Sequence, residues 1–501
     1  MPSLVKSATV IGLDVEPVDV EVEVIPGLPR VTIVGLPDAA VKEASERIIA
    51  ALSNSGFVPP RHRTIVNLAP AHIKKEGPQF DLPIALAFLI ASGQCSAQVH
   101  DYVFTASLGL DGTLRPIVGT VALGEYANAR NAILIVASEN SKEALLAGGK
   151  VMTASNLREL VEFLEKKREL FLCEPSEELG DEQMRVTDFG EIAGQEHAKR
   201  ALEVAAAGNH NVLMHGSPGS GKTLLARAFA GILPSLSINE AFEVTKIYSI
   251  KGLLNSKQNL IRIRPFRSPH HSTSAVALIG GGSSPQPGEV TLAHRGVLFL
   301  DEFAEFPRQV LEHLRQPLED GYVTVSRAAG TQKFPARFSL VAAMNPCPCG
   351  FYGDPIRTCT CSPGEVSKYQ RKISGPLLDR IDLHVHVPSV ESKIILDHVS
   401  AEPSARVRKR IEFARHKQFE RFGKEMTNAE MSGEDIRKYC PLSEENKSLI
   451  AKAADSLHLS TRAIHRTIKV ARTIADLMES DLVKKEHLAE ALQYRTPLGE
   501  N

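Results

Sequence analysis

The chain has 501 residues, of which 43% are hydrophobic and 23% are charged, and its formal net charge is −1. This composition is typical of a globular protein with about three domains, and it excludes a largely disordered chain. A net charge near zero gives no general attraction to nucleic acid or to membranes, so any basic surface must be local. No stretch reaches the roughly 18 uncharged apolar residues of a membrane span, and the N-terminus lacks the basic and apolar pattern of a secretion signal. The sequence therefore predicts a cytoplasmic protein with no membrane partner.

Four segments with different patterns follow one another along the chain. Residues 1–170 combine strand-like alternation with apolar helical runs and are predicted to form an α/β domain. The acidic stretch 171–187 is predicted to be a linker. In 188–389, short apolar strands alternate with helices, which is typical of a parallel sheet covered by helices. Residues 390–501 show helical periodicity and are predicted to form a helical lid.

A phosphate-binding loop lies in the third segment, between an apolar strand pattern and a helical one, which is the context that such a loop requires. Its residues are Gly216, Ser217, Pro218, Gly219, Ser220, Gly221, Lys222 and Thr223. The glycines let backbone N–H groups wrap the phosphates of ATP, and the helix N-terminus adds positive potential. We expect Lys222 to reach the β- and γ-phosphates and Thr223 to offer its hydroxyl to Mg²⁺.

Two later apolar strands also end in polar side chains. The first delivers Asp301, which is expected to hold Mg²⁺, and Glu302, which is expected to activate the attacking water. The second ends at Asn345, which can position that water, although an asparagine in a plain turn is the alternative. Arg380 and Arg462 are candidate cations for the transition state, and each could instead belong to a solvated face.

Four cysteines form two close pairs on either side of a loop that contains glycine and proline. The pairs are Cys347 with Cys349 and Cys359 with Cys361. Four thiolates suit tetrahedral Zn²⁺ in a structural site, and this is the favoured prediction. The tight Cys-x-Cys spacing leaves an iron–sulfur cluster and unliganded reduced thiols as alternatives.

Two basic runs, 262–267 and 406–424, could contact phosphate backbones. The second also fits an amphipathic lid helix with a solvated face. His270 and His271 have no further ligand placed nearby by the sequence, so both are predicted to be loop residues.

Several long runs resemble one family when they are taken in order. They are the phosphate loop, RPFRSPHHSTSAVALIGGG, HRGVLFLDEF, LRQPLEDG, AAMNPCPCG, LLDRIDLHV and STRAIHRTIKVARTIADL. They resemble the magnesium-chelatase-like AAA+ ATPases and, among these, the ComM/YifB family. The resemblance extends over nearly the whole chain, including GLPDAAVKEASERI near the N-terminus. It implies an AAA+ P-loop core with a parallel sheet, a helical lid, and ATP and Mg²⁺ as cofactors.

The resemblance also implies a mode of action. It supports the nucleotide and sensor roles given above, with Arg380 as a finger acting across a ring interface and Arg462 as the second sensor in the lid. Related ring motors grip DNA through the insert at 264–282 and a hairpin expected at 321–334. Members of the family are similar to hexameric branch-migration helicases of natural transformation, which implies a homo-oligomeric ring and a branched or single-stranded DNA partner bound without sequence preference. A motor that remodels proteins, similar to the magnesium-chelatase ATPase subunit, is the alternative.

The N-terminal segment resembles the Lon-protease fold, but the residues that such a protease needs are replaced. The run 75–78 matches the approach to the Lon nucleophile, and Gln79 holds the place of the serine. The run 109–119 matches the approach to the catalytic lysine, whose place is held by Val121. Without a hydroxyl nucleophile and its lysine base, covalent peptide hydrolysis cannot proceed. The domain is therefore expected to be a proteolytically inactive scaffold or a DNA-facing ring.

Overall fold

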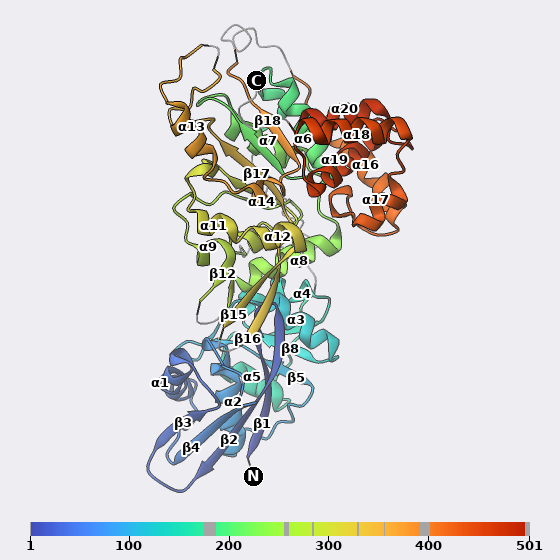
Figure 1. The fold of residues 1–501 in the computed structure, drawn as a ribbon. Coiled ribbons are helices and arrows are strands. Elements are labelled where there is room, and N and C mark those ends of the chain that lie inside the picture. Colours follow the sequence, from blue (N-terminus) through green and yellow to red (C-terminus); the bar gives the residue numbers. More distant parts are fainter. Residues whose placement is uncertain are drawn as a thin grey trace.

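The computed structural model describes residues 2–174, 187–254, 260–282, 285–327, 330–354, 356–390 and 401–495. The N-terminal part lies at one end, the large parallel sheet lies above it, and a group of helices packs to one side of that sheet (Figure 1). Within the described residues, none of the helices has the length and apolar character needed to cross a membrane.

The N-terminal part begins with a four-stranded sheet in the order β1-β2-β4-β3, in which only β3 and β4 run parallel. Alternate residues are buried at the start of β1, whereas Ser7, Ala8 and Thr9 are all buried, so this strand is covered on both faces farther along. Two helices pack with this sheet: α1 starts at the capping residue Asp38, and α2 is buried along most of its length. These elements are β1 (Ser3–Ile11), β2 (Asp14–Ile25), β3 (Arg30–Val34), α1 (Ala39–Asn54), β4 (Arg63–Ala69) and α2 (Asp81–Ala91).

The rest of the N-terminal part holds a parallel three-stranded sheet in the order β5-β8-β9 and a short antiparallel pair, β6 with β7. These elements are β5 (Tyr102–Phe104), β6 (Ser107–Leu108), β7 (Leu114–Arg115), α3 (Thr120–Ala129), β8 (Ile133–Val136), α4 (Ser141–Leu145), β9 (Lys150–Thr153) and α5 (Leu157–Leu164). Gln79 donates a hydrogen bond to Thr9 Oγ1 (3.2 Å), and Val121 is fully buried in α3. The likeness to the Lon fold stays a prediction, while the α/β class is confirmed.

The central part is a five-stranded, wholly parallel sheet in the order β11-β14-β17-β10-β18. Strands β14 and β17 are buried along their whole length, because helices cover both faces of the sheet. These elements are α6 (Glu196–Gly208), β10 (Val212–His215), α7 (Lys222–Ile232), α8 (Ile238–Ile250), β11 (Phe266–Arg267), β14 (Val297–Leu300), β17 (Ser339–Met344) and β18 (Leu383–His386).

Two insertions extend from this core toward the N-terminal part (Figure 1). The first joins α9 and α10 through the short pair β12 and β13, and the second is the hairpin β15–β16, which the sequence predicted. The helices and strands of the two insertions, together with the neighbouring helices α11 to α14, have the following bounds. They are α9 (Ala275–Ile279), β12 (Gly280–Gly281), β13 (Gln286–Pro287), α10 (Glu289–Leu292), α11 (Arg308–Glu312), α12 (Arg315–Asp320), β15 (Tyr322–Arg327), β16 (Gly330–Pro335), α13 (Pro363–Gln370) and α14 (Gly375–Leu378).

The C-terminal part is helical, as predicted, and packs against α6 and α7. Its apolar side chains belong to the same buried cluster as the sheet, so the two parts share one core. The helices are α16 (Ser404–Phe422), α17 (Gly433–Tyr439), α18 (Glu444–Ser456), α19 (Thr461–Leu477) and α20 (Lys485–Gln493).

Contacts of the described residues join the N-terminal part to the core, as two examples show. Helix α3 packs on α8, where the Gly119 N–H donates to Ser249 O (3.1 Å) and Lys246 pairs with Glu125 (2.5 Å). The hairpin meets the turn between β1 and β2, where Gly12 lies against the side chain of Gln332. The predicted linker, except for its ends, lies outside the described residues.

Candidate nucleotide site and cysteine cluster

Three neighbouring strands of the central sheet end side by side and deliver the predicted nucleotide residues. Strand β17 pairs with β10 on one side and with β14 on the other. The phosphate loop follows β10, Asp301 follows β14, and Asn345 follows β17. Because carboxyl ends of parallel strands meet at one edge, residues far apart in sequence form one site.

The backbone of the phosphate loop requires glycine at two positions in particular. A Cβ atom at Gly216 would lie 2.0 Å from the carbonyl oxygen of Val387, so no larger residue fits. Gly221 starts helix α7 with a φ of +91°, which favours glycine. The hydroxyl of Ser220 is buried and has no hydrogen-bond partner among the described residues, so it is free to contact a phosphate oxygen.

The side chain of Lys222 folds back over this loop. Its Nζ donates to Gly216 O (2.7 Å), to Ser217 O (2.9 Å) and to Asn345 Oδ1 (3.3 Å). Burial lowers the pKa of Lys222 to about 8, and the charge of Asp301 opposes this shift only in part. The ammonium group therefore lies against the phosphate-binding backbone, and it loses its proton at a lower pH than an exposed lysine does.

This pKa predicts a pH dependence of nucleotide binding. Below pH 8 Lys222 is already protonated, whereas above pH 8 a proton must be taken up before the lysine can pair with the phosphates. We expect ATP affinity to fall above pH 8 by up to about tenfold per unit, with uptake of about one proton. Titration calorimetry at pH 7.5 and 9, in buffers of different ionisation enthalpy, measures the ATP affinity and the number of protons taken up. An ATP affinity that is the same at both pH values would contradict the lowered pKa of Lys222.

Thr223 and Asp301 are in direct contact at the start of α7. The Thr223 hydroxyl donates to Asp301 Oδ2 at 2.8 Å. One hydroxyl and one carboxylate are the oxygen ligands that Mg²⁺ takes beside nucleotide phosphates, so the pair fits this ion. Thr223 and Asp301 would hold Mg²⁺ there, and the bound ion would supply positive charge that stabilises the charge developing on the phosphates.

Glu302 has a partner that the sequence prediction missed. Its Oε2 lies 2.8 Å from Nδ1 of His271, and His270 stacks on His271 with ring centroids 4.0 Å apart. His271 lies in a loop, as predicted, and this loop follows β11, the strand that pairs with β14. No pattern in the sequence marks the contact, because β11 has only two residues. His271 holds the carboxylate that is expected to activate water.

Arg380 and Arg462 meet at a third residue, Glu319. Arg380 is 9% exposed, and its guanidinium bonds to Glu319 and to Pro376 O (2.7 Å). Arg462 Nη2 lies 2.6 Å from the other oxygen of Glu319. Burial raises the pKa of Glu319, but the two arginines outweigh this effect and lower it overall. Within the described residues, the polar contacts of both arginines are with this cluster and not with the phosphate loop of the same chain.

The four cysteines predicted as metal ligands lie together. Their sulfur atoms are all within 4.8 Å of one another, and three of the separations are 3.3, 3.5 and 3.7 Å. Four sulfurs around Zn²⁺ at about 2.3 Å lie roughly 3.8 Å apart, so the cluster fits a tetrahedral metal. The backbone N–H groups of Phe351 and Thr360 lower the pKa of the Cys349 thiol, which favours a thiolate.

The loop between the two cysteine pairs also contacts the phosphate loop. Its Asp354 accepts a hydrogen bond from the Ser217 hydroxyl and another from Ser389 (3.3 Å). The bond from Ser217 and two backbone N–H groups lower the pKa of Asp354 to about 2, so it is ionised. Gly350 packs against the ring of Pro218. A metal in the cysteine cluster would therefore fix one wall of the nucleotide site.

We expect metal loss to weaken ATP binding through this contact. Purified protein should hold about one zinc per chain, and Cys349→Ser with Cys359→Ser should hold none. We expect these substitutions to weaken ATP binding several-fold, and Asp354→Asn to do the same while keeping its zinc. Metal analysis and nucleotide titration measure the two effects separately. Less than about half a zinc per chain would contradict the metal assignment.

Several arginines of the two basic runs are held by partners within the fold. Arg264 is tied to Glu240 (2.9 Å), and Arg267 pairs with Glu289 (2.7 Å). In the second run, Arg415 is buried and donates to Ala206 O (2.7 Å), and Arg421 pairs with Asp476. These arginines join elements of the fold, so they cannot contact a phosphate backbone without breaking internal pairs. The lid-helix alternative for 406–424 agrees with the structure.

The strand order, the phosphate loop after β10 and the acidic end of β14, which β17 separates from β10, define an AAA+ P-loop ATPase fold. The family models described as "Magnesium chelatase, subunit ChlI", "Subunit ChlI of Mg-chelatase" and "Magnesium chelatase, subunit ChlI C-terminal" match residues 188–395, 20–140 and 401–495. The chain belongs to the ComM/YifB family of magnesium-chelatase-like AAA+ ATPases, for which ATP and Mg²⁺ are the implied cofactors.

Full-length relatives carry this family assignment. The chain is 42% identical over 499 residues to the uncharacterized protein YifB of Escherichia coli, covering 98% of this chain and 97% of the relative. It is 43% identical over 502 residues to the competence protein ComM of Haemophilus influenzae, with the same coverage. The magnesium-chelatase 67 kDa subunit of Chlorobaculum parvum is 29% identical over 162 residues, which is 32% of this chain and 23% of that subunit.

Proposed function

We propose that the protein is an ATP-driven ring motor that acts on DNA, as a branch-migration helicase in recombination or natural transformation. The observation that carries this proposal is the match along 98% of the chain to a relative named as a competence protein. The hairpin β15–β16 and the insert between α9 and α10 would be the elements that contact DNA, without sequence preference.

The described residues have the chemistry for ATP hydrolysis. Lys222 and the loop N–H groups would bind the phosphates, and Thr223 and Asp301 would hold Mg²⁺. Glu302 would accept the proton of the attacking water, with Asn345 beside the γ-phosphate to orient it. Hydrolysis breaks the bond to the γ-phosphate and yields ADP and phosphate.

The placement of Arg380 and Arg462 supports a ring of identical copies, which we propose to be a hexamer. Their polar contacts join them to Glu319, so they are gathered as a pair at one place on the protomer. In a ring, this pair would face the nucleotide of the neighbouring copy and stabilise charge in the transition state.

The ATPase rate with and without branched DNA tests this proposal. We expect forked DNA to raise the rate several-fold at low salt and to lose this effect as salt rises. A rate that ignores DNA would overturn the proposal and favour the second candidate, a motor that remodels a protein partner. The observation that favours this candidate is the local match to the magnesium-chelatase subunit.

A further inference from the structure

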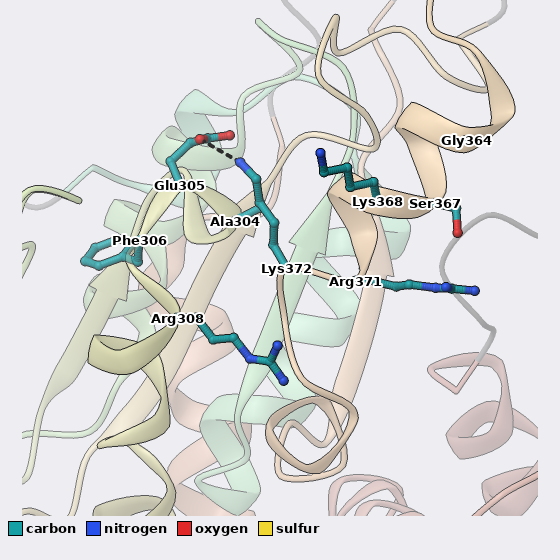
Figure 2. A pocket seen from close by; sticks show the side chains of 9 residues that line it. All are labelled: Ala304, Glu305, Phe306, Arg308, Gly364, Ser367, Lys368, Arg371 and Lys372. Carbon is teal, nitrogen blue, oxygen red and sulfur yellow. Dashed lines mark hydrogen bonds and ion pairs between the residues drawn. The ribbon is translucent and has the colours of Figure 1, made fainter.

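A cavity of about 750 Å³ lies between the segment that follows β14 and helix α13. Four cationic side chains line it together with a single carboxylate, that of Glu305 (Figure 2). The cations are Arg308, Lys368, Arg371 and Lys372. This charge pattern was not among the basic runs that the sequence suggested.

Most of this positive charge is not neutralised within the protein. Glu305 lies 3.0 Å from Lys372, and this pair accounts for the one carboxylate of the lining. Arg308, Lys368 and Arg371 are exposed, and no ion pair or hydrogen bond joins their side chains to the rest of the described chain. The buried side chain of Phe306 and the backbone of Ala304 add an apolar part to the wall. The cavity therefore suits an anion.

The shape favours an extended anion that reaches in from outside. Arg308 belongs to α11 and Lys368 to α13, and the two face the hollow from different walls, while Arg371 extends away from them along the rim (Figure 2). Cations spread over two elements match the spaced charges of a phosphodiester chain better than one compact ion.

The position of the cavity agrees with this ligand. Helix α9, the first element of the insert, packs on α11, the helix that carries Arg308. Arg264 and Arg267, at the start of that region, are already paired with glutamates and cannot serve. We propose that the cavity binds backbone phosphates of the nucleic acid on which the motor acts. This inference rests on the proposed function and adds a contact site to it.

The test compares two double charge reversals on the same background. All proteins carry Glu302→Gln, so hydrolysis does not enter. The pocket variant adds Arg308→Glu and Lys368→Glu, and the control adds Lys142→Glu and Lys452→Glu, two exposed lysines elsewhere. The net charge change is the same in both. Binding of labelled forked DNA is measured with ATP over a salt series, and thermal melting checks that each variant is folded.

We expect the pocket variant to bind at least about tenfold more weakly at low salt, with a salt slope shallower by about 1.5, because two phosphate contacts are lost. The DNA affinity of the control should stay within twofold of that of the parent.

Equal binding by the two variants would overturn the inference while the proposed function stands. A fall in affinity for ATP itself would also overturn it, because the cavity would then serve a nucleotide of the neighbouring copy. Absence of DNA binding in the parent would remove the proposed function as well. Lys368→Ala alone is the milder change, and we expect it to make the salt slope of DNA binding shallower by about 0.8.

Discussion

Glu302→Gln is expected to abolish turnover while leaving ATP bound. Glutamine keeps the shape of the side chain but cannot accept a proton from water, and loss of a general base costs about 10²- to 10⁴-fold in rate. Lys222, Thr223 and Asp301 remain in place, so nucleotide affinity should change little. Single-turnover hydrolysis and a nucleotide-binding titration separate the two effects.

The matched control is Glu312→Gln on α11, a nearby carboxylate that pairs with Arg315 (2.5 Å). Its rate should stay close to that of the parent. If Glu302→Gln hydrolyses ATP within about threefold of the parent, another group must be the base, since such a factor is far below the general-base contribution.

Arg380→Ala is expected to lower the hydrolysis rate by about 10³- to 10⁵-fold, the contribution of arginine fingers in GTPases. Glu319 keeps Arg462 as a partner, so the loss should not unfold the site. Thermal melting checks this point.

Mixing two inactive variants tests whether the arginine acts on a neighbouring copy. Arg380→Ala subunits retain a working Glu302, and Glu302→Gln subunits retain a working Arg380. In a random ring, about a quarter of the interfaces then combine an intact base with an intact finger. We expect the ATPase rate of the mixture to rise toward about a quarter of the rate of the parent protein. No recovery, with mixed rings present, would mean that Arg380 acts within its own subunit.

The parts of the site that the sequence could predict are those encoded within short runs. The phosphate loop and the acidic strand end each occupy fewer than ten consecutive residues, and their strand and helix contexts are visible beside them. The α/β class, the parallel core sheet and the helical C-terminal part are confirmed for the same reason. Which of the proposed residues act in catalysis stays a prediction.

The contacts that the sequence could not predict join distant residues. His271 reaches Glu302 only because β11 pairs with β14. Asp354 and Ser217 are 137 positions apart, and no pattern marks Asp354 as more than a loop residue. The pairing of Arg264 and Arg421 was not visible in the basic runs, because their partners, Glu240 and Asp476, are 24 and 55 positions away.

The contact between the hairpin and the N-terminal part has a mechanical consequence. The apolar face of β15–β16 shares a cluster with Leu13 at the turn after β1, and β16 leads directly into β17, which ends beside Asn345. A shift that begins at the γ-phosphate would therefore travel along a stiff ribbon and push against the N-terminal part. In the proposed motor, the N-terminal part would resist this movement as well as support the hairpin. Deletion of the N-terminal part would expose the apolar face of the hairpin. We therefore expect a shortened chain to aggregate rather than to hydrolyse ATP faster.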